Sequence, residues 1–160
     1  MEIHEGKYLT FSLGKEEYGI PILKVKEIIG MMEITEVPKS PEFVKGVINL
    51  RGKIIPLMDL RLKFGLEEIE YSERTCIIVI DIKNKDNLRQ IGVAVDSVSE
   101  VVSIQREAIE PPPNYEDGEY EGFLTGIAKV DNKVVMLLNT DKAFKFKGLV
   151  KINSLVNPDE

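Results

Sequence analysis

The sequence predicts a mainly β protein made of two small closed barrels, of about five short strands each, packed together with short helices. Apolar and polar residues alternate with period two along much of the chain, as at Leu9, Phe11 and Leu13. Two-residue turn signals, among them Arg51-Gly52 and Asp131-Asn132, separate such segments. The chain also contains an internal repeat. Closing each copy into a barrel would remove the exposed edges that short antiparallel units otherwise leave.

The first half is predicted to hold strands, a short helix and a hairpin. Apolar residues recur at spacings of three and four after Pro21, which predicts a short helix that Gly30 ends. Because β-branched residues dominate this segment, a strand stays open as the alternative. Asp59 stands at the N-cap position of a helical turn that Gly65 ends. The apolar positions of the first helix are Ile22, Val25, Ile28 and Ile29, and the strands are residues 8–13, 18–22, 44–50 and 53–58.

The second half is predicted to hold more strands and one long loop. Residues 111–121 combine three prolines with an acidic run, which is typical of a solvated loop. A short amphipathic helix is expected after Asn139, followed by a polar tail. The strands expected here are residues 74–83, 88–96, 126–130 and 133–138.

The internal repeat has a downstream part that aligns without a gap. Residues 44–64 match residues 124–144 at an offset of 80, so that Gly46 falls on Gly126. Turn signals fall on turn signals in this alignment. A repeated unit of this size is marginal alone, so two copies are expected to share an apolar layer between them.

An upstream part of the repeat aligns residues 19–29 with residues 92–102 at an offset of 73. We therefore predict a first subdomain at residues 1–70 and a second at residues 71–160, which includes the C-terminal helix and tail. Whether strands are exchanged between the halves stays open at this point.

Composition excludes several classes of chemistry. The chain of 160 residues has one histidine, one cysteine and no tryptophan, which argues against a zinc site, a disulfide framework and a histidine–cysteine catalytic pair. Cys76, in an apolar run, is interpreted as a small buried hydrophobe. We predict neither a cofactor nor a metal.

The charge of the chain is −6, and residues 66–139 hold fifteen acidic against seven basic side chains. This balance gives no general attraction to nucleic acid or to anionic lipid. No segment approaches the ~20 apolar residues of a membrane span, and the start lacks the pattern of a signal peptide. The protein is expected to be cytoplasmic.

Motif tests leave one candidate segment. Gly46 to Gly52-Lys53 fails as a phosphate loop because its spacing is wrong and its flanks are both strands. The aspartates at strand ends are expected to act as turn or cap residues. Asn49-Leu50-Arg51-Gly52 is either a plain hairpin turn or a rigid mount for an arginine that anchors a partner's carboxylate. The aspartates in question are Asp59, Asp81 and Asp96.

Five blocks in a fixed order carry a family resemblance, and they are residues 14–20, 22–28, 44–52, 56–61 and 92–96. Together they resemble the CheW-like family of bacterial chemotaxis coupling proteins, over a stretch from about Tyr8 to Phe144. The resemblance implies two SH3-like five-stranded barrels that form one CheW-like domain.

The resemblance also implies a function. The chain would be a non-enzymatic adaptor that joins the cytoplasmic hairpin tip of transmembrane chemoreceptors to the regulatory domain of the histidine kinase CheA. It would be a monomer when free, bind no nucleic acid, insert into no membrane, and be recruited to membrane-associated receptor arrays. A detached CheA-type regulatory domain and a small carboxylate-dependent hydrolase stay open as alternatives.

By motif position the resemblance implies two sets of contact residues. For Ile28 and Val101, which fall in the receptor-facing set, packing in the core stays open as the alternative to a receptor contact. Glu27 and Arg51 resemble a family pair that forms a salt bridge, and Gly46 resembles a position where the backbone tolerates no Cβ. The receptor-facing set is Val25, Glu27, Ile28, Gly46, Val98 and Val101, and the kinase-facing set is Asn49, Leu50, Arg51, Gly52, Glu110 and Tyr115.

Overall fold

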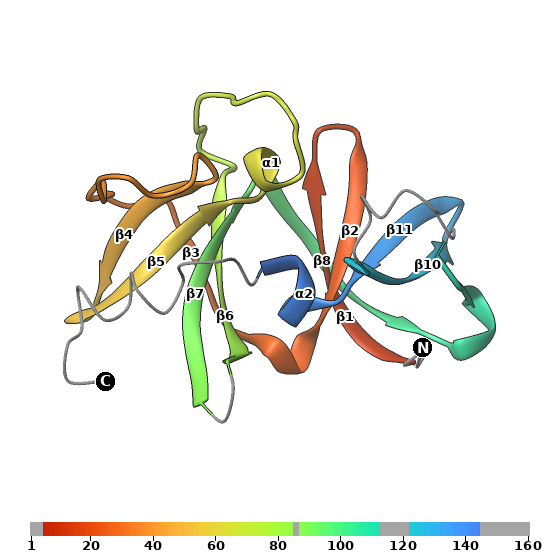
Figure 1. Ribbon diagram of the computed structural model, residues 1–160. Helices are drawn as coiled ribbons and strands as arrows, with labels where there is room; N and C mark the ends of the chain where they lie inside the picture. Colours follow the sequence, from red (N-terminus) through yellow and green to blue (C-terminus); the bar gives the residue numbers. More distant parts are fainter. Residues whose placement is uncertain (1–4, 85–86, 113–121, 145–160) are drawn as a thin grey trace.

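The computed structural model describes residues 5–84, 87–112 and 122–144, and most of them lie in strands (Figure 1). The helical elements are short: the 3₁₀ turns η1 (Ile22–Lys24) and η2 (Arg106–Ala108), and the α-helices α1 (Leu60–Lys63) and α2 (Thr140–Phe144). The strands are β1 (Gly6–Leu13), β2 (Glu16–Pro21), β3 (Val25–Gly30), β4 (Val44–Leu50), β5 (Lys53–Asp59), β6 (Cys76–Asn84), β7 (Asn87–Val95), β8 (Ser97–Ile104), β9 (Ile109–Glu110), β10 (Leu124–Val130) and β11 (Lys133–Leu138).

The strands form two sheets, which confirms the mainly β class. Sheet A has the order β8-β1-β2-β11-β10-β9, and sheet B has the order β3-β6-β7-β5-β4. Neither order closes on itself through hydrogen bonds, but the chain leaving β8 at one edge of sheet A returns as β9 at the other edge. Each sheet takes strands from both sides of residue 70. The subdomain bounds 1–70 and 71–160 therefore stay a prediction, and two such subdomains would exchange strands with each other.

The internal repeat is visible in the two hairpins β4–β5 and β10–β11. In both, the register shifts directly before a glycine, Gly46 in β4 and Gly126 in β10. Both hairpins end in a two-residue turn with two positive φ angles, at Arg51-Gly52 and at Asp131-Asn132. The offset of 80 therefore aligns the same backbone geometry.

The offset of 73 is visible in two parallel pairings. Leu57 of β5 lies opposite Gly92 of β7, and Leu137 of β11 lies opposite Gly19 of β2. Both glycines pack closely against their neighbours: an added Cβ on Gly92 would lie 2.9 Å from Ile77, and one on Gly19 would lie 3.1 Å from Leu137. Each glycine thus lets a neighbouring side chain fill the space over the sheet.

The helix predicted after Pro21 is wrong beyond its first turn. Only Ile22–Lys24 turns, as η1, and Val25–Gly30 is strand β3, paired antiparallel with β6. Burial alternates residue by residue along β3, as a strand requires. The β-branched side chains favour this extended form, and the backbone hydrogen bonds to β6 decide the ambiguity.

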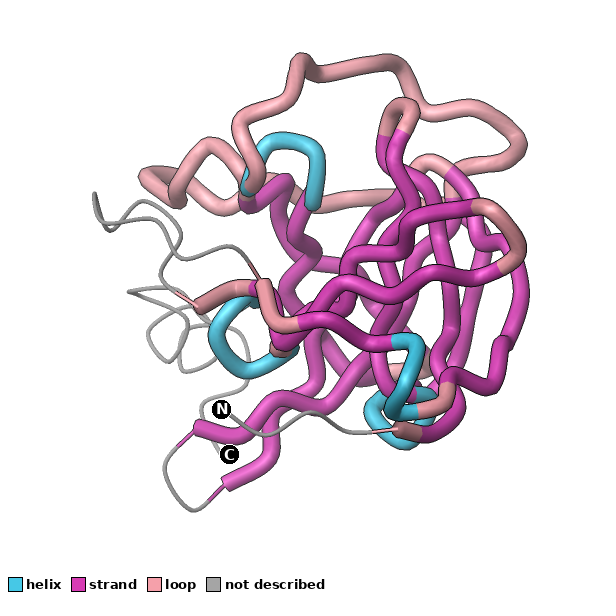
Figure 2. Tube along the Cα trace, turned by 90° about the vertical axis from the view of Figure 1, so that its right-hand side faces the viewer, coloured by secondary structure: helices cyan, strands magenta, loops and turns pink. Residues whose placement is uncertain are grey.

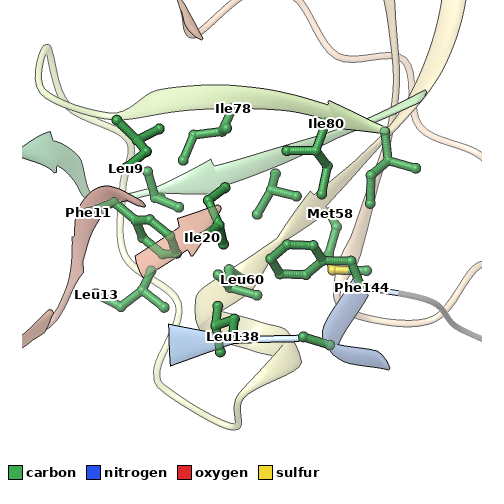
Figure 3. Close-up of a cluster of buried hydrophobic side chains, with 14 of the residues drawn as sticks. Leu9, Phe11, Leu13, Ile20, Met58, Leu60, Ile78, Ile80, Leu138 and Phe144 are labelled. Carbon is green, nitrogen blue, oxygen red and sulfur yellow. The ribbon is translucent and has the colours of Figure 1, made fainter. Parts of the chain in front are cut away.

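The main hydrophobic cluster lies between the two sheets. Leu9, Phe11 and Ile20 reach it from sheet A, and Ile78 and Ile80 reach it from sheet B (Figure 3). Three further clusters are built mainly from one sheet each: those around Ile55 and Val47 from sheet B, and the one around Val135 from sheet A. An apolar layer is therefore shared between the two sheets. It was predicted between the two halves of the chain, and that part stays a prediction because each sheet takes strands from both halves.

Two local predictions have different outcomes. Asp59 caps α1 as predicted, because its side chain accepts hydrogen bonds from the backbone N–H groups of Arg61 and Leu62. Cys76, in contrast, is half-buried rather than buried. It stands at the start of β6, and its thiol lies 3.3 Å from the carbonyl oxygen of Arg74.

Candidate functional site

The turn between β4 and β5 holds Arg51 in a defined position. Arg51 and Gly52 have φ angles of 52° and 89°, the pair of positive values that a type I′ hairpin turn needs. The side-chain oxygen of Asn49 accepts a hydrogen bond from the Gly52 N–H at 2.8 Å. Leu50 is buried in the cluster around Ile55 of sheet B. The side chain of Arg51 projects from this turn and is 70% exposed. The positive φ of Arg51 was missed from sequence because it is not a residue that favours this region.

Arg51 forms an ion pair with Glu27 of β3. Its Nη1 donates to one carboxylate oxygen at 3.3 Å, and its Nη2 donates to the other. The fork geometry of a guanidinium on a carboxylate makes this pair directional. The hydrogen bond and charge of Glu27 raise the pKa of Arg51. The contact predicted from the resemblance is present. It joins a residue from the set predicted to face the receptor to one from the set predicted to face the kinase.

The second half of the repeat carries different charges at the equivalent place. The offsets put Glu100 at the position of Glu27 and Asp131 at the position of Arg51. Asp131 has the same backbone conformation, with φ 47°. Two acidic side chains therefore replace an ion pair, and the two halves are not electrostatically interchangeable.

Gly46 is required by a close backbone contact. Its φ is 144°, and an added Cβ would lie 2.1 Å from the carbonyl oxygen of Thr35. Thr35 pairs there with Val47 through two backbone hydrogen bonds of 2.8 and 2.9 Å. Gly46 itself is buried. Because it has no side chain, the segment at Thr35 can pair with β4 and cover this edge of sheet B.

The receptor-facing side chains predicted on β3 and β8 differ in exposure. Val25 and Val98 are partly buried against the central cluster. Ile28 and Val101 are 42% and 51% exposed, so the core-packing alternative for these two is wrong. The strands β3 and β8 stand at one end of sheet B and of sheet A respectively, so this set is divided between the two sheets.

Glu110, also predicted to face the kinase, lies in the other sheet from the Arg51 turn. Glu110 is exposed on β9, in sheet A, and Lys129 lies 3.8 Å from its carboxylate. Tyr115 lies outside the described residues.

Polar contacts at one end of the molecule were missed from sequence. Asp59 is buried and accepts a hydrogen bond from the Tyr71 hydroxyl at 2.9 Å. Burial and the neighbouring Asp59 raise the pKa of Tyr71. Asp96 pairs with Arg61 at 2.7 Å. Local spacing carries no signal for contacts between residues so far apart in the chain.

A cavity of about 560 Å³ lies beside α2, lined in part by Tyr8, Lys24, Thr140 and Lys142. None of the predicted contact residues that the structure describes lines this cavity. Within the described ranges, His, Cys, Asp and Glu side chains form no group of three that could hold a metal ion. No helix in that part of the chain is long and apolar enough to span a membrane.

Comparison with known proteins decides the family. The model of the CheW-like domain matches residues 7–147. The chain belongs to the CheW-like family. Chemotaxis protein CheW of Klebsiella aerogenes is 37% identical to this CheW-like chain over 149 residues, which cover 93% of the chain and 87% of that protein. Chemotaxis protein CheW of Helicobacter pylori is 34% identical over 139 residues, covering 87% of the chain and 81% of that protein.

A solved structure matches the CheW-like fold as well. The crystal structure of the scaffolding protein TtCheW from Thermoanaerobacter tengcongensis superposes with a TM-score of 0.78 at 37% identity. The match covers 91% of this chain and 96% of that one. The two sheets described above are thus the CheW-like architecture.

Proposed function

We propose that this chain is a chemotaxis scaffold that couples the cytoplasmic hairpin tip of chemoreceptors to the regulatory domain of the histidine kinase CheA. It acts by binding, without catalysis or a cofactor. It is a cytoplasmic monomer when free and is recruited to receptor arrays at the membrane.

The family match carries this proposal. Residues 7–147 match the CheW-like domain, and a relative with 37% identity is named a chemotaxis protein and another a scaffolding protein. The surface supports it, because Ile28 and Val101 expose apolar side chains at repeat-equivalent positions on two strands. Such side chains suit the docking of an amphipathic helical hairpin.

The hairpin at Asn49–Gly52 supports a second contact. Arg51 is exposed on a rigid turn and keeps donors for a partner's carboxylate at its outer side, while Glu27 fixes its orientation. We assign the kinase contact to this hairpin together with Glu110 and Tyr115. One scaffold that holds two partners at once raises their effective concentration for each other.

Co-sedimentation tests the coupling. Purified chain is mixed with receptor-containing membranes and CheA, and each component is left out in turn. We expect the chain to sediment with receptor membranes in the absence of CheA, and the amount of CheA in the pellet to rise when the chain is present. If the chain stays in the supernatant in every mixture, the proposed function is wrong.

A further inference from the structure

The chain passes between the sheets at two places among the strands that the structure describes. The first connection runs from β2 to β3 through η1. The second runs from β7 to β8 through a single residue, Asp96. Each connection leads directly into β3 or β8, the two strands that carry all the proposed receptor-facing residues except Gly46.

Asp96 joins the two sheets with its side chain as well. Its Oδ2 accepts a hydrogen bond from the Gly14 N–H, in the β1–β2 turn of sheet A, at 2.7 Å. The same oxygen accepts from Nη1 of Arg61, in α1 at the end of sheet B, also at 2.7 Å. The Asp96 N–H donates to the carbonyl oxygen of Ser12 at 3.1 Å. The Asp96 carboxylate therefore accepts one hydrogen bond from sheet A and one from the end of sheet B.

Arg61 extends this contact into the loop that follows α1. Its Nε donates to the carbonyl oxygen of Glu67 at 2.9 Å. The loop lies at the same end of the molecule as the β1–β2 turn (Figures 1 and 2). The side chains of Arg61 and Asp96 are 14% and 22% exposed, so their ion pair is largely shielded from water and salt.

An apolar layer by itself restricts the angle between two sheets only weakly. Hydrophobic burial is non-directional, and packed elements can slide over one another by small shear movements. Charge-assisted hydrogen bonds are directional. The contacts of Asp96 stand at one end of this layer, where a small rotation between the sheets would break them.

We propose that Arg61 and Asp96 are positioning residues that set the angle between the two sheets, and with it the spacing of β3 and β8. This inference rests on the proposed function for its consequence: a receptor hairpin that contacts Ile28 in sheet B and Val101 in sheet A needs that spacing. Among the kinase-facing positions, Asn49 to Gly52 lie on one hairpin of sheet B, and their mutual arrangement does not depend on the angle, whereas Glu110 lies in sheet A.

Binding of each partner is measured separately for Arg61→Gln and Asp96→Asn. We expect the affinity for receptor-containing membranes to fall about tenfold, the effect of one charge-assisted hydrogen bond. The affinity for CheA should fall less, because the Asn49–Gly52 hairpin lies within sheet B and only Glu110 lies in sheet A. Arg61→Lys keeps a cation beside Asp96 and should recover most of the receptor affinity. Glu68→Gln is the matched control, because it removes an ion pair with Lys45 in the same region without crossing between sheets.

The angle itself is measured with spin labels at Leu88→Cys in sheet B and Val134→Cys in sheet A, in a Cys76→Ser background. Both positions are more than half exposed, so labels should leave the core intact. We expect the label–label distance distribution to broaden in Asp96→Asn and in Arg61→Gln, and to stay narrow in Glu68→Gln.

An unchanged distribution in both folded variants would overturn the inference, and so would equal losses of receptor and CheA affinity. Thermal unfolding identifies a variant that does not fold, and Arg61→Lys then supplies the comparison. If the unaltered chain binds neither partner, the proposed function fails, while the distance measurement still decides the role of the Arg61–Asp96 pair.

Discussion

Gly46→Ala is expected to destabilise the protein by about 3–5 kcal/mol through one backbone contact. A Cβ at this position would lie 2.1 Å from the carbonyl oxygen of Thr35 and 2.8 Å from its carbonyl carbon. These are backbone atoms, so no rotamer change can move them away. The φ of 144° is also a conformation that residues with a side chain rarely adopt.

The magnitude follows from what the substitution breaks. To relieve the clash, the segment at Thr35 must move away from β4, which breaks its two hydrogen bonds with Val47. Each contributes about 1 kcal/mol, and the strained backbone adds about 1–3 kcal/mol. Gly52→Ala is the matched control, because its φ is also positive, at 89°, but no atom lies within 4 Å of the added Cβ. It should cost about 1–2 kcal/mol.

Urea unfolding followed by circular dichroism measures the free energy of unfolding for the unaltered chain and both variants. We expect Gly46→Ala to lose more stability than Gly52→Ala by about 1–4 kcal/mol. If the two losses are equal, the close approach of Thr35 to Gly46 does not restrict this position, and the reasoning is refuted.

Three further outcomes are expected. Arg51→Asp should abolish activation of CheA in a mixture with receptor membranes and leave the melting temperature nearly unchanged; full activation would reduce Arg51 to a turn residue. Val101→Glu should weaken receptor binding about tenfold or more, because it places an unpaired charge on an apolar docking face. Val134→Glu, a change of equal exposure on β11, should not weaken it, and equal effects would contradict the assignment to β8. The raised pKa of Tyr71 means that the folded state holds this proton more tightly than the unfolded state does. Stability should therefore fall as the pH rises above about 10, the ordinary tyrosine value. Tyr71→Phe should make the free energy of unfolding depend less on pH in this range. If urea unfolding at about pH 9 to 11 shows the same pH dependence for Tyr71→Phe as for the unaltered chain, the assignment to Tyr71 is wrong.

Local patterns predicted the parts of the fold that depend on neighbours in the chain. The hairpin at Arg51-Gly52 and the cap at Asp59 each depend on a few consecutive residues, so their residue types suffice to predict them. The segment after Pro21 was predicted wrongly because its spacing fits one face of a helix while its β-branched residues fit a strand. Pairing with β6, far along the chain, decides between the two.

The candidate site shows the same division. The Glu27–Arg51 pair was anticipated from family motifs, but its geometry comes from the neighbourhood of β3 and the β4–β5 turn in sheet B. Ile28 and Val101 could not be separated from core residues by type, because an apolar residue on an edge strand packs inward or outward according to register. Their exposure depends on how β3 and β8 pair with neighbouring strands, because that pairing sets the side of the sheet that each side chain faces.

By itself, the sequence determined that this is a β protein with an internal repeat, few reactive side chains and a family resemblance, since composition, periodicity and motif order are properties of the chain. Only the tertiary structure decided that strands from both halves make up each sheet and that the predicted receptor-facing residues are divided between the sheets. It also decided that Asp96 joins the sheets through Gly14 and Arg61. These features depend on contacts between residues distant in the chain, which come together only when burial of the shared apolar layer brings the two sheets into contact.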